Sequence, residues 1–172
     1  MSQSSLPHST PKVALVGLVT ALALVDVALL AVSPTTSQIE LLRLLLAVGG
    51  FGAVVLALVA GIDHNPRYAL GAALSVPFVA LYAYTGLVLP WTQLSFTIAQ
   101  AGIELALSVP VVGDPLASAL FGGSTISQAT LQASFRYHYA LVALALVGVV
   151  TAVGTVGWRH LTAVRSEETP RS

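Results

Sequence analysis

The chain has 172 residues, of which 56% are apolar and only 8% are charged, and its seven basic residues balance its seven acidic ones. An ordinary soluble domain carries roughly 25% charged residues, so this composition excludes a typical water-soluble fold, and the balanced charge excludes a basic surface for nucleic acid. The absence of cysteine excludes disulfide bonds, iron–sulfur clusters, thioether-attached haem and thiolate catalysis. The composition therefore predicts an all-α integral membrane protein, with the lipid bilayer as its surroundings.

Four apolar runs are long enough to cross the roughly 30 Å hydrocarbon core of a bilayer. They cover residues 13–32, 39–62, 68–89 and 129–158. The first run is too long for the core of a signal peptide and is expected to be retained as a span. Pro77 is expected to kink the third run, which membrane helices tolerate. The glycines at 49, 50 and 52 in the second run allow close approach of a neighbouring helix or a flat ligand.

Two shorter apolar runs, residues 96–107 and 115–120, lie between the third and fourth long runs. Because neither can span a bilayer, both are predicted to be interfacial helices on one membrane face. The sequence therefore predicts a four-helix bundle over residues 13–158, with a polar N-terminal tail (1–12) and a polar cytoplasmic tail (159–172). The end of the cytoplasmic tail is expected to be disordered.

The basic residues predict how the bundle lies in the membrane. Four spans place both termini and the loop near residue 65 on one side, which then carries five basic residues (Lys12, Arg67, Arg159, Arg165 and Arg171) against two on the other (Arg43 and Arg136). The positive-inside rule predicts a multi-pass cell-membrane protein with both termini in the cytoplasm and the interfacial helices on the outer face. Trp91 and Trp158 fall at opposite ends of spans, as amphipathic rings prefer.

Several motifs in the second half of the chain resemble the N-terminal half of cytochrome b. Residues 86–96 (GLVLPWTQLSF) are similar to the family's GYVLPWGQMSF. Without a gap, residues 107–113 (LSVPVVG) resemble SAIPYIG, residues 121–123 (FGG) resemble WGG, and residues 129–138, which end in FRYH, resemble ATLTRFFAFH. The resemblance is specific from Gly86 to His138 and looser over the first two spans.

The resemblance implies two haems between the second and fourth spans, each bound by two histidines. His138 matches the first ligand of the fourth span, but Ala152 stands where the second ligand is expected. In the second span, residues 43–49 (RLLLAVG) resemble the family's R-x-x-H-A-N-G, which puts Leu46 and Ala60 at the other two ligand positions. Since three of the four ligands are missing, we expect that this chain lacks bis-histidine haem.

His138 and Arg43 each keep two interpretations. His138 could bind a single b-type haem, alone or with a ligand from another chain; the favoured alternative is a residual histidine near the outer membrane surface. Arg43 occupies the position of a family arginine that meets haem propionates. It also stands at the head of a span, and an interfacial arginine that snorkels to the membrane surface is the favoured interpretation.

Asp26 is the one acid deep within a predicted span. An ionisable residue at such depth costs roughly 2.5–3.5 kcal/mol on insertion scales, so proton handling or partner binding is one hypothesis. Protonation of Asp26, or a hydrogen bond from a neighbouring helix, is the equally weighted alternative. Glu104, on the first interfacial segment, is expected to face lipid headgroups.

In the family the first interfacial helix and the turn after it form part of a quinol-oxidation pocket. Phe96, Ala99, Pro110 and Gly113 occupy the matching positions here. The rest of that pocket comes from a C-terminal half of cytochrome b, so a complete quinone site would require a second subunit.

The first functional hypothesis is a haem-poor or haem-less, cytochrome b-like subunit of a respiratory bc-type quinol-oxidising complex, with a role in assembly or quinone access. It would not be an enzyme on its own, and its partners would be a C-terminal cytochrome b half and a Rieske-type protein. Two alternatives stay open: an electron carrier with one b-type haem on His138, and a non-redox bundle that binds quinone or lipid.

Overall fold

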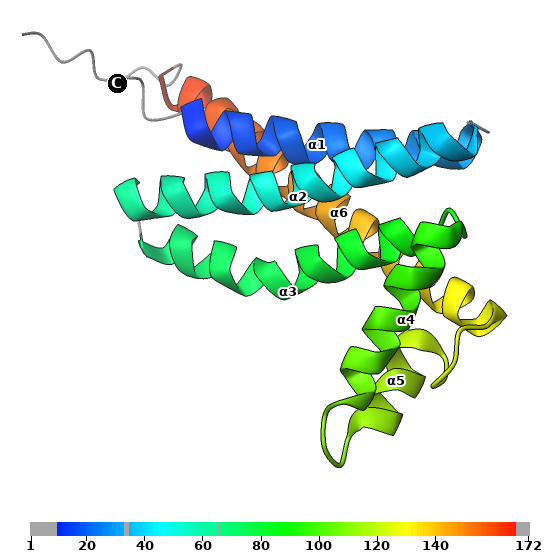
Figure 1. The fold of residues 1–172 in the computed structure, drawn as a ribbon. Helices are drawn as coiled ribbons and strands as arrows, with labels where there is room; N and C mark the ends of the chain where they lie inside the picture. The colour runs from blue at the N-terminus through cyan, green and yellow to red at the C-terminus, as the bar shows by residue number, and fades with distance from the viewer. Residues whose placement is uncertain (1–9, 33–34, 65, 168–172) are drawn as a thin grey trace, which may run out of the picture.

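The computed structural model describes residues 10–32, 35–64 and 66–167. Within these ranges the chain forms six α-helices and no strand (Figure 1). The helices are α1 (Thr10–Ala31), α2 (Thr36–His64), α3 (Pro66–Val88), α4 (Gln93–Leu107), α5 (Gly113–Phe121) and α6 (Gln128–Glu167). The prediction of an all-helical membrane bundle, with two short helices between the third and fourth spans, is therefore confirmed.

Four of these helices are long and apolar enough to cross a membrane. The candidate spans are Val13–Ala31, Thr36–Val59, Ala69–Val88 and Gln128–Thr155. Helix α3 continues through Pro77, the midpoint of its range, and bends near its middle (Figure 1). Helix α6 continues beyond residue 158, where the sequence predicted the start of a polar tail, and ends at Glu167. The expected disorder at the end of that tail concerns residues 168–172, which lie outside the described ranges.

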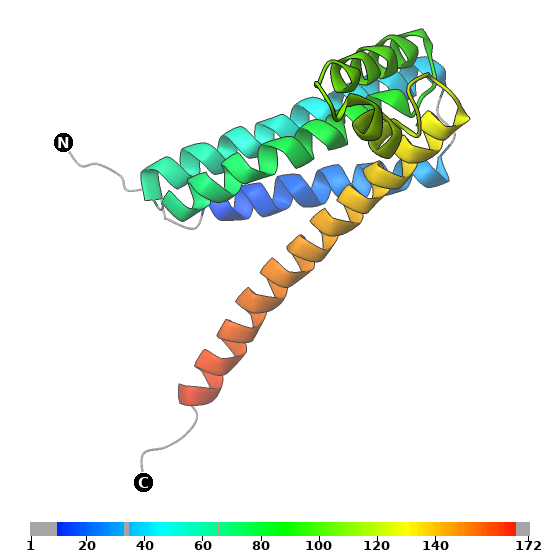
Figure 2. The ribbon, with the colours of Figure 1, turned by 90° about the horizontal axis from the view of Figure 1, so that it is seen from below.

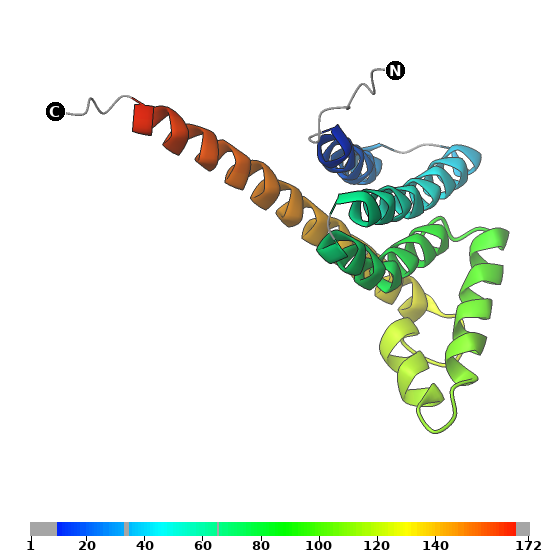
Figure 3. The same cartoon turned by 90° about the vertical axis from the view of Figure 1, so that its left-hand side faces the viewer.

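The four spans pack as a ring in the order α1, α2, α3, α6, with α6 returning to α1. Helices α2 and α6 therefore face each other across the diagonal of the bundle. Figures 2 and 3 show that α6 crosses the other spans obliquely near its own start and then diverges from them toward its C-terminal end. The bundle is consequently closed at the end where α6 begins and open at the opposite end.

Glycines set the closest helix contacts. A Cβ atom on Gly49 would lie 2.6 Å from Leu22 Cδ2 of α1, and one on Gly50 would lie 3.3 Å from Val79 Cγ1 of α3. The predicted close approach of neighbouring helices is thus confirmed at these two positions, whereas a Cβ on Gly52 would meet no atom within 4 Å. Helix α2 is therefore held between α1 and α3 with little intervening side-chain volume.

Helices α4 and α5 form a hairpin that projects across the direction of the spans (Figures 1 and 3). Its interior is a small apolar cluster of Ile103, Ala106, Ala117 and Phe121. Tyr84 of α3 packs against this cluster, and its hydroxyl donates to the carbonyl of Ala99 at 3.2 Å. The hairpin is thus fixed to the end of α3, at the closed end of the bundle.

Candidate functional site

A cluster of polar side chains lies at the closed end of the bundle, where all four spans meet. It comprises Asp26 from α1, Arg43 from α2, Tyr82 and Thr85 from α3, and His138 and Tyr139 from α6, and is called the polar centre below. Asp26, Arg43 and His138 are 0%, 4% and 1% exposed. Charged groups this deeply buried are stable only when paired and hydrogen-bonded.

Asp26 is the acceptor on which the polar centre converges. Its Oδ1 atom accepts a hydrogen bond from Arg43 Nη1 and lies 3.0 Å from His138 Nε2. Its Oδ2 atom accepts a hydrogen bond from the Tyr82 hydroxyl. Hydrogen bonding of Asp26 to neighbouring helices, one of the two interpretations from sequence, is therefore present, while proton handling by Asp26 stays a prediction.

Both ring nitrogens of His138 have partners within the bundle. Nδ1 lies 3.1 Å from the carbonyl oxygen of Tyr82 and 3.2 Å from Thr85 Oγ1. A carbonyl only accepts, so this contact requires a proton on Nδ1. Nε2 lies 2.8 Å from Arg43 Nη1 and 3.0 Å from Asp26 Oδ1, so both members of the ion pair are within hydrogen-bond distance of it.

Aromatic contacts and a glycine hold the imidazole of His138 in place. The ring of Tyr82 stacks on it with centroids 4.8 Å apart and planes 14° apart, and Tyr139 meets it edge-on at 5.2 Å. A Cβ atom on Gly86 would lie 2.9 Å from His138 Cε1, so the ring fills the space beside α3. His138 is thus a buried residue where the four spans meet.

Arg43 lies in the interior of the bundle, so the favoured interpretation as a snorkelling arginine is wrong. Its Nη1 atom bridges Asp26 and His138, and its Nη2 atom donates to the Tyr139 hydroxyl at 3.0 Å. The guanidinium therefore connects α2 with α1 and with α6 across the diagonal. Among the described side chains, its buried Nε atom has no hydrogen-bond partner.

We expect Tyr139→Phe to lower the free energy of unfolding by about 1 kcal/mol, because it removes one hydrogen bond to a charged group in a partly exposed position. The measurement is unfolding of the detergent-solubilised chain in increasing SDS, followed by circular dichroism. The same substitution in an Arg43→Leu background should cost almost nothing, since the donor is then absent. An equal cost in both backgrounds would contradict the assignment of this bond.

The family's other haem-ligand positions supply no donor where the structure describes them. Leu46 is buried in α2 and lines, with Arg43, Tyr82, Gly86 and His138, a small gap too narrow to hold a water molecule. Ala152 is partly buried, and the side chain of Ala60 lies outside the described part of the structure. Within the described residues, no group of three or more histidine, cysteine or acidic side chains could hold a metal ion.

The four residues predicted to contact quinone do not come together. Phe96 lies near the start of α4 and packs on Trp91, with ring centroids 4.7 Å apart. Ala99 is buried beneath Tyr84, whereas Pro110 and Gly113 lie beyond the other end of α4. Eleven helical residues separate positions 96 and 107, which amounts to roughly 16 Å along the axis. None of the four lines the small gap beside His138.

The sequence singled out Asp26, Arg43 and His138 one by one but not as a group, and it missed Tyr82, Thr85 and Tyr139. Their similar depth within the predicted spans could have indicated that they meet. Asp26 is five residues from the end of α1 and Tyr82 six from the end of α3, while Arg43 is the eighth residue of α2 and His138 the eleventh of α6. Because successive spans are antiparallel, these positions fall at one level of the membrane.

Comparison with known proteins shows which family the chain belongs to. The family model described as Cytochrome b(N-terminal)/b6/petB matches residues 63–171, which is more than half of the chain. Among curated proteins, the cytochrome b of Solanum tuberosum and that of Marchantia polymorpha are each 46% identical over 59 residues, and that of Pisum sativum is 44% identical over the same length.

Each of these alignments covers 34% of the chain but only 15% of the relative. The chain thus matches a small part of the length of these cytochromes. No solved structure matches it. The family model, by contrast, extends from the end of α2 through α6 and includes the hairpin and His138. The chain therefore belongs to the cytochrome b N-terminal (b/b6) family.

Proposed function

We propose that the chain is a cytochrome b-like membrane subunit of a bc-type quinol-oxidising complex, and that it acts there without haem. Membership of the family and the four apolar spans support the first part. The second part depends mainly on one observation: Nε2 of His138, the nitrogen that would face a haem iron, is already engaged by Arg43 and lies against Asp26.

Three features of the polar centre do not fit a haem. His138 Nε2 lies within hydrogen-bond distance of both Arg43 and Asp26, so iron would have to displace a buried ion pair. On the opposite span, Leu46 offers an alkyl side chain where a second imidazole would be needed. The small gap beside His138 is too narrow to hold a water molecule, whereas typical cofactor sites enclose roughly 300–1,000 Å³.

The role of such a subunit would be structural. In a bundle without cofactor, the polar centre supplies the cross-link between α2 and α6 that packing alone does not make, because these helices face each other only across the diagonal. A preformed helical subunit of this kind suits assembly of a larger complex. Its partners would be a C-terminal cytochrome b half and a Rieske-type protein, in a cell membrane with both termini in the cytoplasm.

The test is an absorption spectrum of the detergent-purified chain, dithionite-reduced minus oxidised, with a pyridine haemochrome assay for stoichiometry. We expect no Soret band. One haem per chain, lost in His138→Ala, would contradict the haem-free part of the proposal and make the chain an electron carrier. The structural part has a separate readout: affinity-tagged chain should copurify with subunits of a quinol-oxidising complex from its native membrane, and purification as a single species would contradict that part.

Quinone contact has less support. Phe96 and Ala99 lie on α4, while Pro110 and Gly113 lie past its far end, so the four positions form no common pocket within the described residues. Any quinone site would need further residues from a partner.

A further inference from the structure

The turn that joins α4 to α5 is apolar and unusually exposed. Residues 107–112 read LSVPVV, and no charged residue stands between Glu104 and Asp114. The side chain of Val111 is 99% exposed, and Leu105, two residues before the end of α4, is 72% exposed. Residues 105–112 are called the hairpin tip below.

The backbone of the hairpin tip is strained in a way that directs Val111 outward. Val111 has φ +70°, and the amide of Val112 donates to the carbonyl of Pro110 at 2.8 Å, which closes a γ-turn centred on Val111. Positive φ is unfavourable for a β-branched residue. Behind the turn, a Cβ on Gly113 would lie 2.7 Å from the carbonyl oxygen of Leu107, so the two helices are drawn tightly together. This conformation presents the whole isopropyl group to the surroundings.

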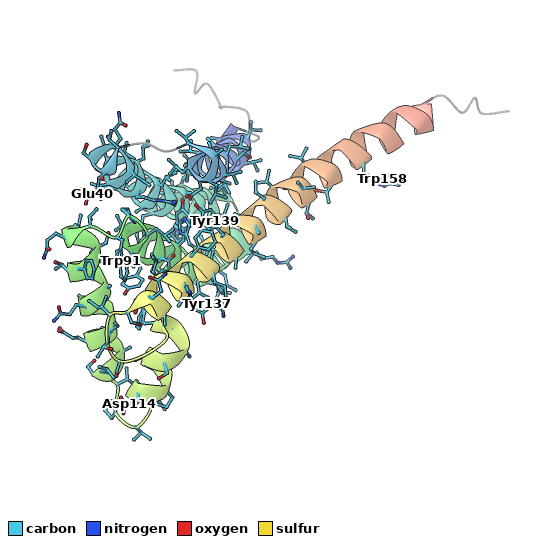
Figure 4. All side chains as sticks on the ribbon, turned by 90° about the vertical axis from the view of Figure 1, so that its right-hand side faces the viewer. Glu40, Trp91, Asp114, Tyr137, Tyr139 and Trp158 are labelled. Carbon is cyan, nitrogen blue, oxygen red and sulfur yellow. The ribbon has the colours of Figure 1, made fainter. Side chains whose placement is uncertain are left out.

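The hairpin tip lies beside the spans. In Figure 1 the hairpin leaves the closed end of the bundle and runs down across the direction of α1, α2 and α3. It slants toward the middle of their length, so that its tip lies to the side of the spans and not beyond their ends. Figure 3 shows the tip displaced sideways from the bundle, and Figure 4 shows the labelled Asp114 at that outer end. A tip in this position meets what surrounds the bundle laterally, which for a membrane protein is lipid.

The outer surface of α4 separates into two stripes. Gln93, Thr97, Gln100 and Glu104 form a polar stripe at helical spacing, and Gln100 donates to Glu104 at 2.8 Å. Leu94, Ala101 and Leu105 form an apolar stripe that leads to the hairpin tip. No lysine or arginine occurs between residues 93 and 121. Helix α4 therefore has the polarity of a helix at a membrane interface, without the basic residues that attract anionic headgroups.

We propose that the hairpin tip inserts into the lipid beside the bundle and anchors the α4–α5 hairpin to the membrane by apolar burial alone. Protein interfaces are enriched in aromatic residues, methionine and arginine, whereas the exposed tip offers valine, leucine and proline. This composition fits hydrocarbon better than a protein partner. The inference is independent of the proposed function, because it concerns the hairpin and not the polar centre.

The experiment uses the absence of cysteine from the chain. Val111→Cys creates a single site for a nitroxide spin label, and Gln100→Cys on the polar stripe is the matched control in the same hairpin. Both labelled chains are reconstituted in phosphatidylcholine vesicles, and collision with oxygen, which partitions into lipid, is compared with collision with a water-soluble nickel chelate. Far-UV circular dichroism checks that both variants keep the helical fold.

The label at Val111 should favour oxygen over the nickel chelate by at least threefold relative to the label at Gln100. Equal accessibility to the nickel chelate at both sites would overturn the proposal. Protection of Val111 that appears only in native membranes with other subunits present, and not in vesicles, would also overturn it, because the occupant of the tip would then be a protein. A third test places the label on Val112→Cys and adds Val111→Asp. The buried charge should draw the hairpin tip out of the lipid, so the label at residue 112 should become accessible to the nickel chelate.

Discussion

Arg43→Leu is expected to lower the free energy of unfolding by about 3–5 kcal/mol, the usual cost of removing one partner from a buried ion pair. The change removes the cation that faces Asp26 and leaves a fully buried carboxylate without its charge partner. It also breaks the contacts of α2 with His138 and Tyr139 on α6. The measurement is the SDS-induced unfolding curve in dodecyl maltoside micelles, followed by far-UV circular dichroism.

The double variant Asp26→Leu/Arg43→Leu is the decisive control. Replacing a whole buried ion pair by apolar residues is often neutral or stabilising, so the double variant should recover most of the stability lost in Arg43→Leu. Arg136→Leu is the matched control, because it removes an exposed arginine of α6. It should change the free energy of unfolding by less than about 0.5 kcal/mol. If Arg43→Leu costs no more than Arg136→Leu, or if the double variant is the least stable, the ion pair does not hold the bundle.

The fold was readable from the sequence because it depends on the lengths of apolar runs. The four spans and the two short helices follow directly from how many consecutive apolar residues a bilayer requires. The end of α6 does not follow, since the helix continues through the polar residues 159–167. Polarity ends a span but does not by itself end a helix, and residues 159–167 contain no proline or glycine.

The candidate site could be predicted from the sequence only in part. Which side chains of two spans meet depends on how each helix is rotated about its axis and how deep it lies in the membrane. Asp26 stood out, since an acid within an apolar run is rare. Arg43 was assigned to the membrane surface because it lies early in its span, and nothing in the α2 sequence shows that its inner face meets Asp26. The residue type of Tyr82 and Tyr139 does not distinguish them, since tyrosine is common near the ends of spans, and only their depth in the spans matches that of Asp26 and Arg43.

Gly61→Ala is expected to lower the free energy of unfolding by about 2 kcal/mol. A Cβ atom at residue 61 would lie 2.3 Å from the backbone nitrogen and 2.7 Å from the Cα of Ala69, in the tight connection where α2 ends at His64 and α3 begins at Pro66. Backbone atoms cannot change rotamer, so the two helices must separate, and overpacking of this kind costs roughly 1–3 kcal/mol. The helix preference for alanine over glycine, up to about 1 kcal/mol, offsets only part of this cost.

Gly52→Ala on the same helix is the matched control, because a Cβ there would meet no atom within 4 Å. It should be neutral or slightly stabilising, so only Gly61→Ala is expected to lower the free energy of unfolding in the same SDS unfolding assay. Equal stabilities of the two variants would show that α2 and α3 have room to separate at residue 61. In the expected case, the contact at Gly61 fixes how α2 and α3 lie against each other, and so helps to place Arg43 on α2 opposite Tyr82 on α3.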